Sequence, residues 1–326
     1  MNREQNDIDI SILCCTYNHE HFIRAALDGL VNQVTDASIE VIVADDASTD
    51  NTQSIIREYC ENYPDLFSKC ILRQSNVGIG KNCYEALSLA EGRYLAICDG
   101  DDVWIDSSKL QRQFEFLQEN PEYTVCCTSL EQRIINGKKI KDSVSYVNDN
   151  IKTSWKIKEY YEFEDLLYCR FVSSCTTMLR WNLKGRVPEW LQNYRIIDYS
   201  LLLLHSAYGH IHVMNDFVSA RYSVHNKGLT QQRNYDSFKE TTKIINEVNK
   251  HLGFIMEEQI QGYFASREYR VKNHLIPVDA TLRTRIIVRL ASSSFLRKAY
   301  SLYRRTAPAP LVRMTSKILD GMLKYN

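Results

Sequence analysis

The chain has 326 residues, of which 44% are hydrophobic and 25% are charged, a composition typical of a globular protein with a sizeable core. Lys and Arg (40) balance Asp and Glu (40), so the overall charge excludes a basic nucleic-acid coat protein and an acidic tail. No apolar run reaches the roughly 18 residues that cross a bilayer, and the polar N-terminus does not read as a secretory signal. We therefore expect a cytoplasmic protein. None of its 10 cysteines forms a CxxC pair, so we expect them to be reduced structural thiols.

The first third of the chain alternates strand-like and helix-like segments. Apolar runs predict strands at 8–15, 39–44, 70–73 and 93–98, and helical spacing follows at 19–34, 53–63 and 82–90. This alternation predicts an α/β fold with a mainly parallel sheet and helices on both faces. Thr16, Asp45, Asp46 and Asp99 each follow a predicted strand. Because ligands of such sheets bind at the carboxyl ends of the strands, we expect one crevice to gather these side chains.

The remainder of the chain has a different pattern. From about Pro121 it predicts short strands and a polar insertion, followed by the helical segment RIIDYSLLLLHSAYG and the strand-like HVMNDFVSARYSVH. From Ser237 the spacing predicts helices with few breakers. No internal repeat or low-complexity tract interrupts the chain.

Asp99-Gly100-Asp101-Asp102 is the sharpest chemical feature of the sequence. Three carboxylates within four residues repel one another unless a cation lies between them, and carboxylate oxygens suit Mg²⁺ or Mn²⁺. Either ion would also neutralise the charge of a departing diphosphate. The alternative is an acidic turn or helix cap, because Asp-Gly-Asp is common in loops.

Four segments together resemble glycosyltransferase family 2, a family of inverting enzymes with the GT-A fold. They are ISILCCTYNHEHFIRAALDGLVNQ, IEVIVADDASTDNT, NVGIGKNCYEAL and GRYLAICDGDDVWIDSSKLQRQ, in the order of the family. The resemblance implies a Rossmann-like sheet with a C-terminal helical appendage. It also implies metal-dependent transfer of a hexose or hexosamine from a nucleoside-diphosphate sugar, with UDP expected, to an acceptor hydroxyl.

The resemblance also implies roles for individual residues. Thr16 and Asp46 would contact the nucleobase, with Tyr17 and Asp45 beside them, and Lys81 would lie near the diphosphate. Asp99, Gly100 and Asp101 would form the DxD element that holds diphosphate and Mn²⁺ or Mg²⁺, with Asp102 as an adjacent metal ligand. His225, in the Tyr-x-x-His element that begins at Tyr222, would add a metal ligand or a diphosphate contact. The alternative for His225 is an ordinary hydrogen-bonded residue at a strand end.

A carboxylate base is also expected in the second half of the chain, and Asp198 matches the family's position best. Such a base would remove the acceptor proton while the acceptor attacks the anomeric carbon from the face opposite the leaving group. Asp198 precedes an apolar helix, so a helix N-cap is the alternative. Asp165 and Asp216 are rival candidates for the base.

The segment after Thr281 is rich in basic residues at helical spacing with apolar ones, and Asp320 is its single acidic residue. Basic amphipathic helices bind anionic membrane surfaces, so we expect a peripheral position on the inner face of the membrane. The alternative is a helical subdomain packed on the core with a solvated basic face. No motif predicts nucleic-acid binding.

We expect three regions in the chain. Residues 1–120 would form the nucleotide-sugar-binding half, 121–235 the acceptor-binding half, and 236–326 a basic helical region. The acceptor expected from the resemblance is a surface polysaccharide or a lipid-linked oligosaccharide. Two other functions stay open: a nucleotidyltransferase of similar fold, and a non-catalytic nucleotide- or sugar-binding protein.

Overall fold

The computed structural model describes residues 8–136, 139–145, 158–169, 171–226, 228 and 237–272. Contacts divide the chain into two compact units. One comprises Met1–Asn148 and Lys158–Glu257, and the other comprises Asp149–Ile157 and Glu258–Asn326. The described part of the second unit lies in helix α9 (Glu257–Lys272). The predicted basic helices after Thr281 fall outside the described residues. None of the described helices has the length and apolar character needed to cross a membrane.

A mixed sheet runs through the first unit, with the strand order β3-β2-β1-β4-β8-β6-β9-β5 and β7 paired to β6. Its strands are β1 (Ile10–Thr16), β2 (Ile39–Asp45), β3 (Lys69–Leu72), β4 (Tyr94–Ile97), β5 (Val103–Trp104), β6 (Tyr123–Asn136), β7 (Lys139–Ser145), β8 (Met178–Arg180) and β9 (His210–Val224). Strands β1 to β4 pair in parallel, β6 is parallel to β9, and β5, β7 and β8 run antiparallel to their neighbours. The predicted mainly parallel sheet is confirmed in its core.

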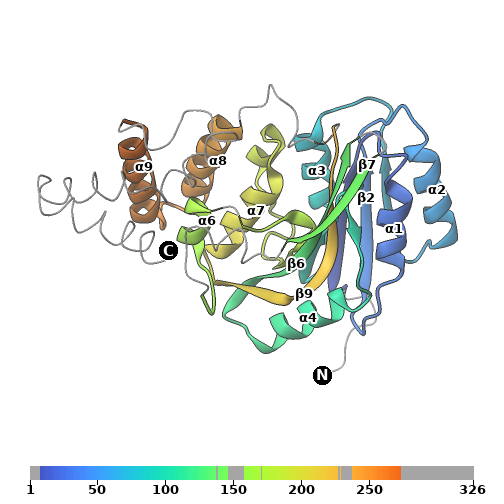
Figure 1. Ribbon diagram of the computed structural model, residues 1–326, viewed down its shortest axis with the longest axis horizontal. Helices are drawn as coiled ribbons and strands as arrows, with labels where there is room; N and C mark the ends of the chain where they lie inside the picture. The colour runs from blue at the N-terminus through green and yellow to red at the C-terminus, as the bar shows by residue number, and fades with distance from the viewer. Residues whose placement is uncertain are drawn as a thin grey trace, which may run out of the picture. The chain divides into compact units, whose positions relative to one another are not determined.

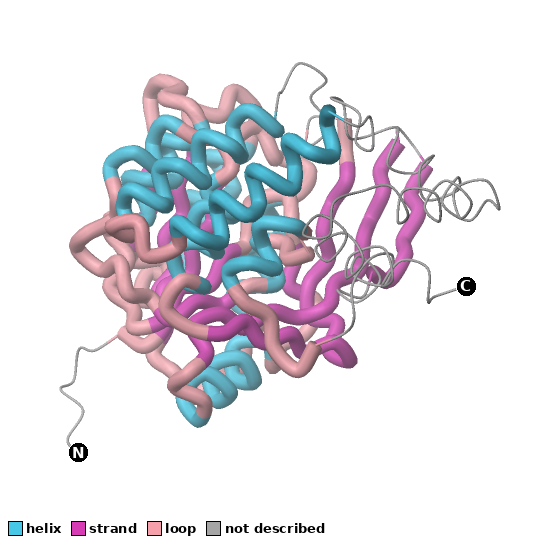
Figure 2. Tube along the Cα trace, turned by 90° about the vertical axis from the view of Figure 1, so that its left-hand side faces the viewer, coloured by secondary structure: helices cyan, strands magenta, loops and turns pink. Residues whose placement is uncertain are grey.

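Helices lie on both sides of this sheet, as Figures 1 and 2 show. They are α1 (Ile23–Val31), α2 (Thr52–Asn62), α3 (Ile79–Leu87), α4 (Lys109–Glu119), α6 (Phe163–Tyr168), α7 (Ile197–Ser206) and α8 (Ser237–His251), with the 3-10 turns η1 (Ser174–Thr176) and η2 (Glu189–Asn193). Helices α1, α2 and α4 share one core cluster with the sheet. Helix α3 packs on β1, β2 and η2, and α7 packs on β6, β8 and α8.

The continuous apolar run of β1 follows from its position in the sheet. Ile10, Ile12 and Cys14 point into the cluster shared with α1, and every residue of the strand is buried. A parallel strand covered by helices on both faces needs apolar side chains at almost every position, so its sequence does not alternate. On α1, Leu27 and Leu30 form part of the matching apolar stripe.

Two expectations drawn from the sequence are wrong. Strand β6 has 14 residues rather than being short, because its first part pairs with β8 and its last part pairs with β7, while β9 runs along most of its length. Cys60 and Cys70 are joined by a disulfide, so not every cysteine is a reduced thiol. The pairing links α2 to β3, two elements that only the fold brings together. The other eight cysteines are free.

Candidate active site

The carboxyl ends of β1, β2 and β4 meet at one edge of the sheet, as expected for neighbouring parallel strands. The loop after β1 is fixed there by the loop before α2. The backbone amide of Asn18 donates to Ser48 Oγ at 2.8 Å, that of His19 donates to Thr52 Oγ1 at 2.9 Å, and Glu20 is held in the same way by Asp50. Asn18 has a φ of 55°, a left-handed conformation that Asn tolerates better than most residues. The loop therefore has a defined shape, set by its backbone contacts.

Gly100 lies directly against the end of β1. Its amide donates to Cys15 O at 2.9 Å, and a Cβ at this position would lie 2.4 Å from Thr16 Oγ1. Only glycine permits the backbone at position 100 to lie this close to the Thr16 side chain. The glycine of the acidic motif therefore places Asp99 and Asp101 beside the loop that follows β1.

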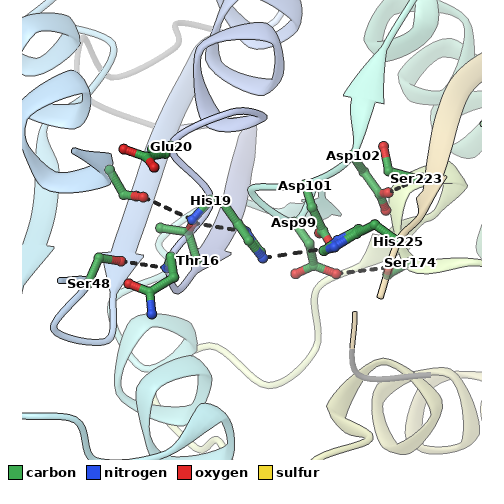
Figure 3. A network of polar contacts seen from close by, with 12 residues as sticks. Thr16, His19, Glu20, Ser48, Asp99, Asp101, Asp102, Ser174, Ser223 and His225 are labelled. Carbon is green, nitrogen blue, oxygen red and sulfur yellow. Dashed lines mark hydrogen bonds and ion pairs between the residues drawn. The ribbon is translucent and has the colours of Figure 1, made fainter. Parts of the chain in front are cut away.

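Three side chains from separate segments converge at this edge. His225 Nε2 lies 2.9 Å from Asp101 Oδ2, and His19 Nε2 lies 3.8 Å from the same oxygen. One ligand atom from each of these residues lies within 4.8 Å of the other two. Figure 3 shows Asp99 and Asp101 between the two imidazole rings. This is the cluster in the described residues that can hold a metal ion, and it contains two of the four ligands predicted from the sequence.

The protonation of this cluster follows from burial and charge. Burial opposes ionisation of Asp101, but the hydrogen bond from His225 and the charges of both histidines hold the pKa of Asp101 below its ordinary value. Burial lowers the pKa of His19, although the charge of Asp101 opposes that shift. A charged carboxylate and a neutral imidazole are the forms in which these side chains bind metal ions.

Asp99 lies in a different electrostatic environment. Burial, together with the charges of Asp101 and Asp198, raises the pKa of Asp99 to about 7. Ser174 Oγ donates to Asp99 Oδ2 at 3.1 Å and favours the charged form. Asp198, whose charge contributes to this shift, lies in the first turn of α7.

The structure separates Asp102 from the other two carboxylates of the motif. Its Oδ1 accepts a hydrogen bond from the backbone amide of Ser223 at 2.9 Å, and Figure 3 shows its side chain pointing toward that residue. Burial raises the pKa of Asp102 well above its ordinary value. The carboxyl therefore ties the acidic motif to β9, two residues before His225, and it does not belong to the His19–Asp101–His225 cluster.

The residues predicted to contact the nucleobase also gather at the ends of β1 and β2. Thr16 Oγ1 lies 3.1 Å from His19 Nδ1. Asp45 accepts hydrogen bonds from the Ser48 amide and hydroxyl and from Gln53. Asp46 accepts the amides of Val77 and Gly78, at 2.7 and 2.9 Å, and so fixes the turn before α3. Tyr17 is 44% exposed beside these buried groups, which leaves its ring free to stack on a ligand.

Lys81 is not brought into the acidic cluster. It lies on α3, half exposed, and its Nζ is 3.8 Å from Glu85 Oε1 in a pair one turn apart. Such an exposed pair contributes little to stability, so the ammonium remains able to turn toward a ligand.

The three candidate bases have different environments. Asp198 is half buried in the first turn of α7, where Ile196 is the N-cap residue, so Asp198 is not the helix cap. Within the described part of the chain no hydrogen bond or ion pair reaches its carboxylate. Asp165 is buried, accepts the Glu162 amide and binds Lys158 Nζ at 2.6 and 2.7 Å. Asp216 is exposed on β9.

The sequence argument missed three residues that shape this site. His19 lies three positions after Thr16, and its place at a predicted strand end was the available signal. Ser174 lies 75 positions from Asp99 in the sequence, and no local pattern connects them. Glu240 of α8 accepts the amides of Arg195 and Ile196 and so holds the start of α7, which carries Asp198.

The fold is an α/β domain with acidic residues at the carboxyl edge of its parallel strands. The comparisons with known proteins identify its family. Residues 11–181, more than half of the chain, match the family model described as glycosyl transferase family 2. The chain belongs to this family, so the resemblance seen in the sequence is confirmed.

Proteins related in sequence match only part of this chain. An uncharacterized protein of Mycobacterium tuberculosis is 49% identical over 134 residues, which are 41% of this chain and 38% of the relative. The UDP-Glc:alpha-D-GlcNAc-diphosphoundecaprenol beta-1,3-glucosyltransferase WfgD of Escherichia coli is 33% identical over 115 residues, or 35% and 43% of the two chains. The chain thus spans about two fifths of the length of these curated relatives.

Solved structures show the same fold. Residues 1–349 of Staphylococcus aureus TarS match with a TM-score of 0.55 at 21% identity, over 83% of this chain and 76% of that one. The mannosyltransferase PcManGT from Pyrobaculum calidifontis, in complex with GDP-Man and Mn²⁺, matches with a TM-score of 0.50 at 15% identity, over 98% and 86%. At these identities the likeness shows the fold alone. The predicted GT-A-like fold is confirmed.

Proposed function

We propose that the protein is a glycosyltransferase that inverts the anomeric configuration of its donor sugar and uses Asp198 as the general base. The observation that carries the proposal is the half-buried carboxylate of Asp198, which has no hydrogen-bond or ion-pair partner among the described residues and whose charge acts on Asp99. A base must be free to accept a proton, and it must lie on the acceptor side of the anomeric carbon, opposite the leaving group. Asp165 is held by Lys158, and Asp216 lies exposed on another strand. Asp198 is therefore the best candidate of the three.

The residues present fit a divalent cation. Bonds of about 2.1 Å place neighbouring ligand atoms about 3 Å apart, close to the 2.9 and 3.8 Å separations of the imidazole nitrogens from Asp101 Oδ2. Asp101 and His225 would hold the ion, with Asp99 beside them, and Asp102 would anchor the motif to β9. A cation bound there would neutralise negative charge on the departing diphosphate.

Donor binding and proton removal would be carried out by side chains of the protein. Tyr17, Thr16 and the turn fixed by Asp46 frame a position for the nucleoside at the ends of β1 and β2, and Lys81 would approach the diphosphate. Asp198 would orient the acceptor hydroxyl and take its proton as the oxygen attacks the anomeric carbon. One direct displacement of this kind inverts the configuration and needs no enzyme nucleophile.

The donor we propose is a UDP-sugar, carrying a hexose or a hexosamine, and the acceptor is a lipid-linked oligosaccharide or surface polysaccharide. The name of the relative WfgD, which is 33% identical over 115 residues, states a UDP-Glc donor and a diphosphoundecaprenol-linked acceptor. We further propose a cytoplasmic protein held at the inner membrane face by the basic region after Thr281, since that leaflet is anionic. Residues 1–120 would then bind the donor and 121–235 the acceptor.

The test is turnover of a panel of UDP-, GDP- and dTDP-sugars with a lipid-linked or oligosaccharide acceptor, measured as released nucleoside diphosphate in Mn²⁺. Asp198→Asn should lower kcat by at least about a hundredfold, the usual loss for a general base. It should leave the donor-induced rise in melting temperature unchanged, because the amide retains the size of the side chain. Asp216→Asn is the matched control and should behave as wild type.

Three other outcomes would contradict the proposal. Near wild-type turnover in Asp198→Asn would place the base elsewhere. Donor binding without turnover in the wild-type protein, whatever the acceptor, would indicate a non-catalytic binding protein. Release of pyrophosphate from a sugar phosphate and a nucleoside triphosphate would indicate a nucleotidyltransferase.

A further inference from the structure

The orientation of His19 is fixed by one contact to its ring and one to its backbone amide. Its Nδ1 lies 3.1 Å from Thr16 Oγ1, and its backbone amide donates to Thr52 Oγ1 at 2.9 Å. These contacts leave Nε2 facing Asp101, and the His19 side chain is only 16% exposed. In metal-binding histidines, a hydrogen bond on one ring nitrogen usually orients the other nitrogen toward the metal.

His225 faces the same carboxylate from the opposite side of the site. Its side chain is 4% exposed, and its ring stacks on Phe22 with centroids 4.6 Å apart and an interplanar angle of 28°. Phe22 also packs edge-on against His19, at 6.1 Å. The bond between Asp102 and the Ser223 amide fixes the end of β9 that carries His225. The two imidazoles and Asp101 are therefore each held by packing or hydrogen bonds before any ion binds.

We propose that His19 is a metal ligand, and that with Asp101 and His225 it forms a two-histidine, one-carboxylate site that selects transition-metal cations such as Mn²⁺ and Co²⁺ over Mg²⁺. The proposal rests on the proposed function, which needs a cation held by Asp101 and His225. It adds a ligand that the acidic motif does not contain.

The selectivity follows from the chemistry of the donor atoms. Mg²⁺ prefers oxygen ligands and gives up its water molecules reluctantly, whereas imidazole nitrogen suits first-row transition metals. A site with two nitrogen donors and one carboxylate oxygen therefore disfavours Mg²⁺. Three ligands also leave open positions in an octahedral ion for the oxygens of a diphosphate.

The alternative is that His19 only pairs electrostatically with Asp101. Metal binding to the full chain, measured without nucleotide, distinguishes direct ligation by His19 from electrostatic pairing with Asp101. Mn²⁺ binding is measured by the paramagnetic resonance signal of the free ion, and Mg²⁺ binding by competition against Mn²⁺. His19→Gln should weaken Mn²⁺ binding at least about tenfold, as loss of groups around a metal does. Mg²⁺ binding should change about twofold or less, so the preference for Mn²⁺ should fall.

His21→Gln is the matched control, because the His21 side chain is 83% exposed two positions away, and it should bind Mn²⁺ as wild type does. A second variant, His19→Cys, should add a sulfur-to-metal charge-transfer band when Co²⁺ binds, which reports direct ligation even if affinity falls.

Wild-type Mn²⁺ affinity and selectivity in His19→Gln, with no such band in His19→Cys, would overturn the proposal. If Asp101→Asn still lost Mn²⁺ binding in that case, the proposed function would stand. Absence of Mn²⁺ binding by the wild-type chain would remove both the metal site and His19 as its ligand.

Discussion

Protonation of the buried His205 should set much of the acid sensitivity of the fold. His205 is fully buried on α7, and its ring stacks on Trp181 with centroids 5.5 Å apart. Its Nδ1 lies 2.7 Å from Leu201 O, whereas among the described residues Nε2 has no hydrogen-bond partner. Nδ1–H is therefore the donor, and Nε2 carries an unprotonated lone pair. Burial lowers the pKa of His205 from 6.5 to about 4.

The sign of the effect follows from which state binds the proton. As the pH falls below about 6.5, His205 becomes protonated in the unfolded chain. In the folded chain it stays neutral until about pH 4, so folding stability decreases across this window. At 1.36 kcal/mol per pKa unit, the full difference is about 3 kcal/mol, and about 2 kcal/mol of it is lost between pH 7 and pH 5.

Urea unfolding followed by circular dichroism at pH 7, 6 and 5 provides the measurement. His205→Phe keeps a ring on Trp181 and cannot titrate, so its stability should fall about 2 kcal/mol less than that of wild type over this range. His21→Gln, at an exposed position, should follow wild type. Parallel pH dependence of wild type and His205→Phe would refute the assignment of a buried, neutral imidazole.

Three further changes test the packing around the site and the role of the basic region after Thr281. Gly100→Ala should lower the free energy of unfolding by about 1–3 kcal/mol, because its Cβ would lie 2.4 Å from Thr16 Oγ1, and urea titration measures the loss. Glu240→Ala should cost about 1 kcal/mol in the same titration and lower kcat, because the amides at the start of α7 lose their acceptor. Replacing four basic residues after Thr281 by glutamine should release the chain from anionic liposomes in a sedimentation assay. Each such residue near the surface contributes about 1 kcal/mol of binding, and unchanged sedimentation would mean a solvated basic face.

The acidic motif at residues 99–102 shows what a local sequence pattern can and cannot predict. Its position after an apolar strand predicted correctly that it would lie at the carboxyl edge of a parallel sheet. The sequence did not distinguish the three carboxylates, which the fold assigns to different partners: Ser174 for Asp99, the two histidines for Asp101, and the Ser223 amide for Asp102. All of these partners come from segments more than 70 residues away.

The sequence by itself determined the alternation of strands and helices in the first third of the chain, the edge of the sheet at which the predicted site residues gather, and the family. These properties depend on hydrophobic period, strand ends and motif order, all of which are local. The tertiary structure alone decided the length of β6, the Cys60–Cys70 pairing, and the choice of Asp198 over Asp165 as the free carboxylate. It also decided that His19 faces Asp101. Each of these depends on distances between side chains that are fixed only when the sheet and its helices have packed.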